Sequence, residues 1–276
     1  MFSLDCYSIQ GQGQKTNQED AIYISPPNNR LQLFMVCDGV GGAAKGEVAS
    51  NIVIKSIQDY VKKNIQNYNN DAFIQAAVSA AELSLNNYLN KNESAIGMGT
   101  TLALLCFNDK GAVAAHIGDS RIYHIRNKEI IWQSTDHSLV SEMVASGIIT
   151  EAQAIDHPKN NVITRALQGN LEKKIRPDIH IFEKIESHDH FFICSDGVLE
   201  AFNDEQLVNG LSEKVKLKPK LEAIANICLK KSRDNYSAIS IEIKDMDQSE
   251  ISKRKNIVKK VIKSVLNIFS SKAENS

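Results

Sequence analysis

The sequence lacks the features that would place it in a membrane, in a secretion pathway or on nucleic acid. Its 276 residues contain no stretch near the roughly 18 apolar residues that a membrane-spanning helix requires. The N-terminal segment MFSLDCYSIQGQ has neither the basic nor the apolar part of a signal peptide. The formal net charge is only −1, so no overall charge attracts nucleic acid. We therefore expect a cytoplasmic protein that does not bind nucleic acid.

Cysteine is scarce and is not arranged in pairs. The five cysteines lie far apart, without C-x-x-C spacing and mostly within apolar runs, at Cys6, Cys37, Cys106, Cys194 and Cys228. This pattern predicts reduced core thiols rather than disulfides, zinc ligands or nucleophiles. The seven histidines show no metal-ligand spacing either, so we expect them to be structural or surface residues. Only His137, which follows Asp136, lies where a catalytic role is worth checking.

What the sequence does contain is typical of one globular domain with a tail, at 42% hydrophobic and 24% charged residues. We expect a domain over 1–243 and, over 244–276, a polar linker followed by a basic amphipathic segment. Apolar residues between Ile257 and Phe269 would form one helical face, and cations between Lys253 and Lys263 the other. Residues 251–270 would then lie on an anionic membrane or a partner, pack on the domain, or remain solvated.

Short runs rich in β-branched or aromatic residues predict six strands, at 31–37, 101–107, 112–117, 121–125, 190–195 and 237–243. Turn residues separate the second, third and fourth of these, which predicts an antiparallel meander. Helical spacing predicts helices over 46–66 and 71–91, the second with Phe73, Ala76, Ala77, Ala80 and Leu83 on its apolar face.

Further helices are predicted at 138–146, after the capping boxes that begin at Thr150 and Asn203, and at 218–231. Hairpin turns outnumber β-α-β crossovers, which favours an α+β fold of antiparallel sheets layered with helices. The segment 134–180 has little strand character, and we expect it to form a helical flap.

The chemistry is concentrated where an aspartate ends an apolar strand and precedes glycine, at Asp38-Gly39 and Asp196-Gly197. A strand holds such a carboxylate rigidly, and glycine allows the backbone to turn close to a ligand. Acidic residues also lie at element boundaries at Glu19-Asp20 and at Asp234. If these carboxylates converge, their repulsion requires cations between them, and oxygen ligands favour Mg²⁺ or Mn²⁺.

These motifs, in this order, resemble the type-2C metal-dependent Ser/Thr protein phosphatases, especially compact bacterial members. The resemblance covers residues 5–243 and rests on six motifs: Lys15-Thr-Asn-Gln-Glu19-Asp20, Asp38-Gly39-Val40-Gly41-Gly42 with Gly46-Glu47, Gly99-Thr100-Thr101, Gly118-Asp119-Ser120-Arg121, Ser195-Asp196-Gly197 and Asp234-Asn235. It implies a four-layer α/β/β/α sandwich with the metal site at one end. It also implies a monomer that acts on phosphoproteins made by a Ser/Thr kinase.

The resemblance further implies a role for each matching position. Asp38 would bridge two Mn²⁺ or Mg²⁺ ions, the Gly39 carbonyl would join one ion, and Asp196 and Asp234 would hold the other. Asp20, with Glu19 beside it, would support the cluster partly through water, and Asp119 would help to hold a third, looser ion. Two such ions lower the pKa of a bridging water, and the resulting hydroxide attacks phosphorus in line without a phosphoenzyme.

Two positions depart from the family pattern. Lys15 stands where many members have the arginine that holds the substrate phosphate; lysine keeps the charge but loses the planar bidentate fork. A solvated surface lysine is the alternative interpretation. Val40 stands where eukaryotic members often have histidine, so leaving-group protonation would fall to metal-bound water or to an unidentified residue.

Two other functions compete with this interpretation. Gly39-Val-Gly41-Gly-Ala-Ala44 fits a dinucleotide-binding fingerprint, with Asp59 about 20 residues further on. However, Asp38 would face the pyrophosphate, and the β-α-β repeat is missing. A non-catalytic phosphoprotein-binding module on the same fold is the second alternative, but Asp38, Asp196 and Asp234 are all retained.

Overall fold

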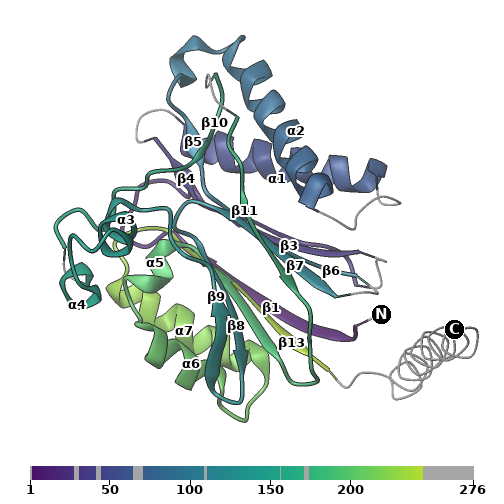
Figure 1. The fold of residues 1–276 in the computed structure, drawn as a ribbon, viewed down its shortest axis with the longest axis vertical. Coiled ribbons are helices and arrows are strands. Elements are labelled where there is room, and N and C mark those ends of the chain that lie inside the picture. The colour runs from purple at the N-terminus through teal and green to yellow at the C-terminus, as the bar shows by residue number, and fades with distance from the viewer. Residues whose placement is uncertain are drawn as a thin grey trace, which may run out of the picture.

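The computed structural model describes residues 2–27, 31–41, 45–64, 71–108, 111–155, 157–170 and 174–244, which form four stacked layers (Figure 1). Two five-stranded sheets face each other in the middle, and helices cover both outer faces. Every strand pair described is antiparallel, as we predicted. This arrangement does not fit the parallel sheet of the dinucleotide-binding alternative.

The first sheet has the strand order β11-β7-β6-β3-β2 and lies under helices α1 and α2. Its strands and helices are β2 (Ala21–Ile24), β3 (Gln32–Cys37), β6 (Leu102–Phe107), β7 (Ala112–Ile117), β11 (Asp178–Phe182), α1 (Gly46–Asn64) and α2 (Asp71–Leu89). A small sheet at one end joins β10 (Leu167–Gln168), β5 (Gly99–Thr100) and β4 (Gly39–Val40), and the short 3-10 helix η3 (Glu93–Ala95) precedes β5.

The second sheet has the order β1-β13-β12-β8-β9 and is covered by α5, α6 and α7. Its elements are β1 (Leu4–Gly11), β8 (Arg121–Arg126), β9 (Glu129–Gln133), β12 (His190–Cys194), β13 (Tyr236–Ile243), α5 (Asp196–Leu199), α6 (Asp204–Leu211) and α7 (Leu217–Lys231). Two short helices, α3 (Leu139–Ala145) and α4 (Glu151–Ala154), lie beside one end of the sandwich (Figure 1).

Three hydrophobic cores fill the spaces between the four layers. Because successive side chains of a strand point to opposite faces, each central strand contributes to two cores. In β3, Met35 faces the helices α1 and α2, whereas Phe34 and Val36 face the other sheet. In β12, Ile193 packs between the sheets and Phe192 packs against α6 and α7. All six predicted strands are present, and all are central strands buried on both faces.

The structure corrects the predicted meander. Strands β6 and β7 pair as expected, but β8 pairs with β12 and β9 in the other sheet. The turn Gly118-Asp119-Ser120 therefore crosses from one sheet to the other instead of closing a hairpin. Turn composition alone does not distinguish a hairpin from a crossing between sheets. In this fold β8 cannot pair with β7, because β6 and β11 occupy both edges of β7.

Two further expectations need correction. Phe73 and Ala77 lie on the buried face of α2 as predicted, but the other apolar residues of this face are Ile74, Val78, Ala81, Leu85 and Leu89, while Leu83 is 60% exposed. The segment 134–180 contains α3 and α4 but also β10 and the start of β11, so it has strand character that we did not predict. Both capping boxes, at Thr150 and Asn203, are present.

Several other features match the sequence analysis. None of the five cysteines forms a disulfide, and all but Cys6 are buried. Among the described residues, no helix is long and apolar enough to cross a membrane. The predicted tail from residue 245 onward lies outside the described residues.

Candidate metal centre

Five aspartates converge at one end of the sandwich although they are far apart in the sequence. Asp38 follows β3, Asp20 precedes β2, Asp196 begins α5 after β12, Asp234 precedes β13, and Asp119 lies in the turn between β7 and β8. The strand pairing explains this convergence, because Ala21 pairs with Cys37, and Cys194 pairs with both Arg121 and Ala238. Each aspartate thus leaves its strand at the same end.

The carboxyl groups perturb one another strongly. Burial, with the charges of Asp20, Asp196 and Asp119, raises the pKa of Asp38 well above its ordinary value. Burial, with the charges of Asp196 and Asp234, raises the pKa of Asp20 to about 7. Burial also raises the pKa of Asp119 to about 7 and that of Asp196 to about 6, with repulsion from neighbouring carboxylates adding to it. The cluster therefore needs positive charge to be fully ionised near neutral pH.

Two oxygen atoms of the cluster identify where that charge would bind. Asp20 Oδ1 and Asp196 Oδ1 are buried without a hydrogen-bond partner among the described residues. The other oxygen of Asp20 accepts a bond of 2.8 Å from Ser195 Oγ–H, which fixes the orientation of the carboxylate. Buried oxygens without donors are costly unless they coordinate a cation. Oxygen donors suit Mg²⁺ or Mn²⁺, so these residues fit a centre for hard divalent cations.

A small hydroxyl network holds Asp38 and the turn of Asp119 together. The Asp38 backbone N–H donates to Thr101 Oγ1 at 2.9 Å, and Thr101 Oγ1 lies 2.7 Å from Ser120 Oγ. Gly118 begins this turn with φ of +99°, and a Cβ there would lie 2.6 Å from the Thr101 side chain. The Gly-Asp-Ser and Gly-Thr-Thr motifs are thus adjacent parts of one support.

Asn235 connects the two loops that carry the other acidic residues. Its Oδ1 accepts from the Glu19 backbone N–H at 2.7 Å, and its Nδ2 donates to the carbonyls of Gln12 and Asn17. The residue is 2% exposed. This side chain therefore holds the Lys15–Asp20 loop against the Asp234 loop.

Gly39 lies where two backbone segments approach closely. Its N–H donates to the Glu19 carbonyl at 3.2 Å, and a Cβ at this position would lie 2.4 Å from the backbone of Gly46. Any larger residue would separate Asp38 from the start of α1. Close packing therefore requires glycine at position 39, where we also predict that the backbone carbonyl is a cation ligand.

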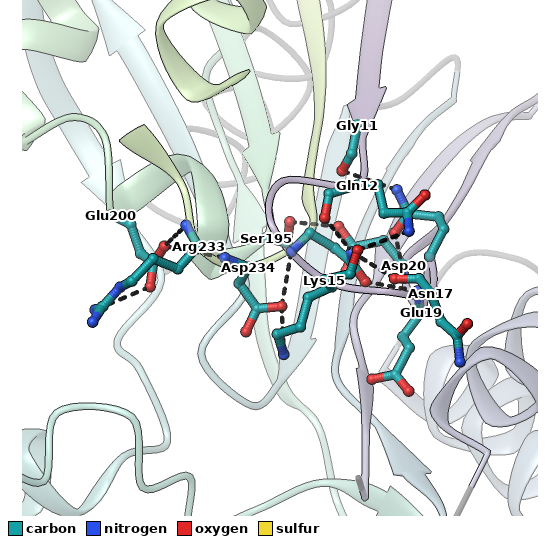
Figure 2. A network of polar contacts seen from close by, with 12 residues as sticks. Gly11, Gln12, Lys15, Asn17, Glu19, Asp20, Ser195, Glu200, Arg233 and Asp234 are labelled. Carbon is teal, nitrogen blue, oxygen red and sulfur yellow. Dashed lines mark hydrogen bonds and ion pairs between the residues drawn. The ribbon is translucent and has the colours of Figure 1, made fainter. Parts of the chain in front are cut away.

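Lys15 and Glu19 are two further predicted site residues, and they lie beside the aspartates. Lys15 Nζ lies 2.9 Å from Asp234 Oδ1, and the Lys15 side chain is 46% exposed (Figure 2). Burial lowers the pKa of Lys15, but Asp234, Glu19 and Asp38 together raise it above the ordinary value. The Glu19 carboxyl group takes part in none of the contacts drawn in Figure 2, and burial raises its pKa.

His137 contacts the turn of Asp119 rather than the acidic cluster. Its ring Nδ1 accepts a hydrogen bond from the Gly118 backbone N–H at 3.1 Å, and the His137 backbone N–H donates to the Gly118 carbonyl. Its ring Nε2 lies 3.2 Å from Asp178 Oδ2. Its ring stacks on His116 with the centroids 4.6 Å apart. Since Nδ1 accepts a backbone bond, the proton of the neutral ring is on Nε2. This tautomer favours a hydrogen bond to Asp178 over metal ligation by His137.

We did not predict from the sequence that Thr101, Ser120, Ser195 and Asn235 support the aspartates, and we singled out His137 only as a catalytic candidate. The first four residues lie inside the motifs quoted above, so their position was a usable signal. The contacts described above join them to partners between 19 and 223 residues away in the chain, so only the structure reveals what they contact.

Fold and site together define a class of protein, a two-sheet sandwich with a divalent-cation centre at one end. A family model for protein phosphatase 2C matches residues 11–238. A putative protein phosphatase 2C-type of Streptococcus pyogenes is 30% identical over 230 residues, which cover 82% of this chain and 92% of that protein. Protein phosphatase PhpP of Streptococcus pneumoniae is 32% identical over 216 residues, covering 77% and 86%. The chain belongs to the protein phosphatase 2C family.

Solved structures agree with this assignment. The Mycobacterium tuberculosis serine/threonine phosphatase PstP/Ppp superposes with a TM-score of 0.78 at 27% identity, over 88% of this chain and 99% of that one. The catalytic domain of PstP in complex with two manganese ions superposes with a TM-score of 0.75 at 26% identity, over 88% and 99%. The predicted four-layer fold is therefore confirmed.

Proposed function

We propose that this protein hydrolyses phosphoserine and phosphothreonine on proteins and depends on two divalent cations. The observation that carries the proposal is the convergence of five aspartates, two of which keep a buried oxygen that accepts no hydrogen bond from the described part of the chain. When bound, Mn²⁺ or Mg²⁺ ions supply an activated water and neutralise charge on the phosphate. The two manganese ions in the PstP catalytic domain support the same requirement here.

The residues of the chain divide this work according to their positions. The charges of three other aspartates raise the pKa of Asp38, and Asp38 would bridge the two cations. The Gly39 carbonyl would be a ligand of one of them. Asp196 and Asp234 would complete the second cation. Asp20 lies deeper, held by Ser195, and would act with Glu19 through water rather than by direct contact alone. Asp119, whose carboxyl group interacts with the charge of Asp196, would help to hold a third, weakly bound ion.

Lys15 would bind the substrate phosphate. Its ammonium group already lies at the cluster, on a loop that Asn235 holds in place. When cations compensate Asp234, Lys15 is released to pair with a phosphate oxygen through a single point charge. Val40 offers no proton donor, so protonation of the leaving group is assigned to solvent at the centre.

The cellular setting follows from the same proposal. Substrates would be cytoplasmic proteins phosphorylated by a Ser/Thr kinase, so the protein would act in signalling as a monomer. The basic segment 251–270 would add a peripheral membrane or partner contact, through cations that each contribute about 1 kcal/mol near an anionic surface. Deleting residues 251–276 tests this role, because unchanged binding to anionic liposomes would end the membrane hypothesis.

The deciding experiment measures phosphate release from a phosphothreonine peptide with Mn²⁺ and with EDTA. We expect turnover only with Mn²⁺, and a loss of at least about a hundredfold in kcat for Asp38→Asn and Asp234→Asn, because each removes a cation ligand. Asp59→Asn is the matched control, since Asp59 lies on the exposed side of α1 paired with Lys55. Equal turnover in all these conditions would overturn the proposed mechanism.

A further inference from the structure

A large cavity adjoins the metal centre. It has a volume of about 740 Å³, and Asp119 and Asp196 line it where it meets the centre. Residues of α3 and α4 line it together with residues of α5 and the start of α6. In Figure 1, α3, α4 and α5 lie together at this end of the sandwich, and α6 lies beside α7 on the outer face of the second sheet. A polypeptide whose phosphate reaches the cations can therefore extend into this cavity.

The cavity is acidic, and the one cationic side chain among its described lining residues is already paired. Arg121 donates two bonds of 2.7 Å to the Asp136 carboxylate and lies 3.4 Å from Asp204 Oδ1. The Tyr123 hydroxyl donates to the same Asp204 oxygen at 2.8 Å. A bidentate guanidinium held in this way has no free edge for an anion. Arg121 therefore links Asp136 to Asp204 in the cavity lining and does not attract negatively charged ligands.

Two glutamates leave uncompensated negative charge on the cavity. Glu151 lies in the first turn of α4 and Glu205 in the first turn of α6, so they come from different walls. Both are exposed, and neither has an ion pair among the described residues. Their helix positions stabilise them locally. Their carboxylates nevertheless remain available to a cationic ligand in the cavity.

Part of the remaining lining is apolar. Val144, Ala154, Leu199 and Phe202 contribute to it, and Ile155 is 74% exposed at the end of α4. An exposed isoleucine next to carboxylates suits a ligand that combines charge with hydrocarbon. Lysine and arginine side chains have this composition, since an apolar stem carries the charged head.

We infer that this cavity binds the part of the substrate that flanks the phosphorylated residue, and that it selects segments rich in lysine or arginine. The inference rests on the proposed phosphatase activity and adds to it a substrate class. Charge complementarity is the basis of the selection. Cations would balance Asp119 and Asp196, Arg121 pairs with Asp136 and contacts Asp204, and Glu200 pairs with Arg233. Because Arg121 carries one charge against two, the cavity keeps negative charge there, and Glu151 and Glu205 add to it. An acidic flanking segment is repelled by the same two glutamates.

The test compares phosphothreonine peptides of one length that carry two arginines or two glutamates, placed before or after the phosphothreonine. On one of the two sides we expect kcat/KM for the arginine peptide to exceed that for the glutamate peptide about three- to tenfold, mainly through KM. The preference should shrink as salt is raised from 50 to 500 mM, because exposed charges are screened.

Variants assign the preference to the cavity. Glu151→Lys with Glu205→Lys should abolish or invert the ratio between the two peptides. The matched control, Glu129→Lys with Glu213→Lys, makes the same change in net charge outside the cavity lining and should leave the ratio unchanged. Equal kcat/KM for all peptides, or the same shift in both double variants, would overturn the inference. A wild-type protein that hydrolyses neither the peptides nor p-nitrophenyl phosphate with Mn²⁺ would instead contradict the proposed function.

Discussion

Asp38 is unfavourable for the stability of the metal-free protein but suited to binding cations. In the metal-free protein its carboxyl group lies among other carboxyl groups, and burial and repulsion raise its pKa. The same neighbours make it suited to a shared position between cations. Function at this residue therefore requires an arrangement that destabilises the protein until the metal binds.

Asp38→Asn should separate these two effects. We expect the variant to raise the melting temperature of the EDTA-treated protein at pH 7.5 by about 3–6 °C, because about 1–2 kcal/mol of repulsion is removed. It should also lose most of the rise in melting temperature that Mn²⁺ causes in the wild type. Thermal unfolding followed by circular dichroism measures both changes. A variant that is less stable than the wild type in EDTA would contradict the proposed repulsion.

Substitutions at Lys15 test whether this side chain binds the substrate phosphate. Lys15→Arg restores a planar fork for two phosphate oxygens, so KM for a phosphothreonine peptide should fall about threefold, with little change in kcat. Lys15→Ala should raise KM about tenfold. Initial-rate kinetics at saturating Mn²⁺ give both values. If Lys15 is only a surface partner of Asp234, all three proteins will share one KM, and the phosphate-binding role will be wrong.

His137 tests whether the turn of Asp119 is held from outside the cluster. His137→Ala removes the acceptor for the Gly118 N–H and should weaken Mn²⁺ binding at the Asp119 site severalfold. His137→Asn places an oxygen near the position of Nδ1 and should retain most of the affinity. Calorimetric Mn²⁺ titration measures the effect. A lower melting temperature with unchanged Mn²⁺ affinity would show that His137 only stabilises the fold.

The turn between β7 and β8 is the decisive element of the site. It leaves one sheet, enters the other and places Asp119 beside Asp196, which a hairpin within one sheet would not do. Thr101 and Ser120 secure it to the loop of Asp38. The geometry of the acidic cluster thus depends on one three-residue connection.

Gly118→Ala should disturb this connection. The residue has φ of +99°, and the added Cβ would lie 2.6 Å from Thr101 Cγ2, so both backbone strain and a clash oppose the substitution. We expect a loss of about 2–3 kcal/mol in the free energy of unfolding, measured with urea. Gly147→Ala is the control: it also has positive φ, but nothing lies within 4 Å of its Cβ. Equal losses in the two variants would mean that contact with Thr101 is unimportant.

For the whole molecule, cation binding should be linked to pH. Without metal, the pKa values of Asp20 and Asp119 are about 7 and that of Asp196 is about 6, each raised from 3.8. Folded metal-free protein therefore retains protons that the unfolded chain has lost, and the stability contribution of these groups declines as pH rises from about 4 to 7. A cation must displace those protons to bind.

The stabilisation by Mn²⁺ should accordingly increase from pH 5.5 to about 7.5 and then level off. The measurement is the difference in melting temperature between Mn²⁺- and EDTA-treated protein at each pH, which should grow by several degrees. Buried histidines such as His190, whose pKa burial lowers to about 3, contribute equally to both states and cancel in the difference. A difference that does not vary with pH would contradict the shifted carboxyl groups.

The sequence alone determined the central framework of this protein. All six strands that we predicted are central strands, because burial on both faces requires continuous apolar runs that are visible in the sequence. The edge strands β1, β9 and β11 were not predicted, and β2 was noticed only as a short apolar run. Edge strands are half-exposed and mix polar with apolar residues, so their sequences resemble loops.

The motifs likewise identified every aspartate of the cluster, because each lies next to the beginning or the end of an apolar run. Only the tertiary structure decided what holds these aspartates together. Strand pairing across the sheets brings Asp20, Asp38, Asp119, Asp196 and Asp234 to one end, and Thr101, Ser195 and Asn235 orient their loops. The cavity beside them lies between two pairs of helices, α3 with α4 and α5 with α6, which are remote from each other in sequence. Local composition determines which residues can carry charge, but long-range packing determines which charges meet.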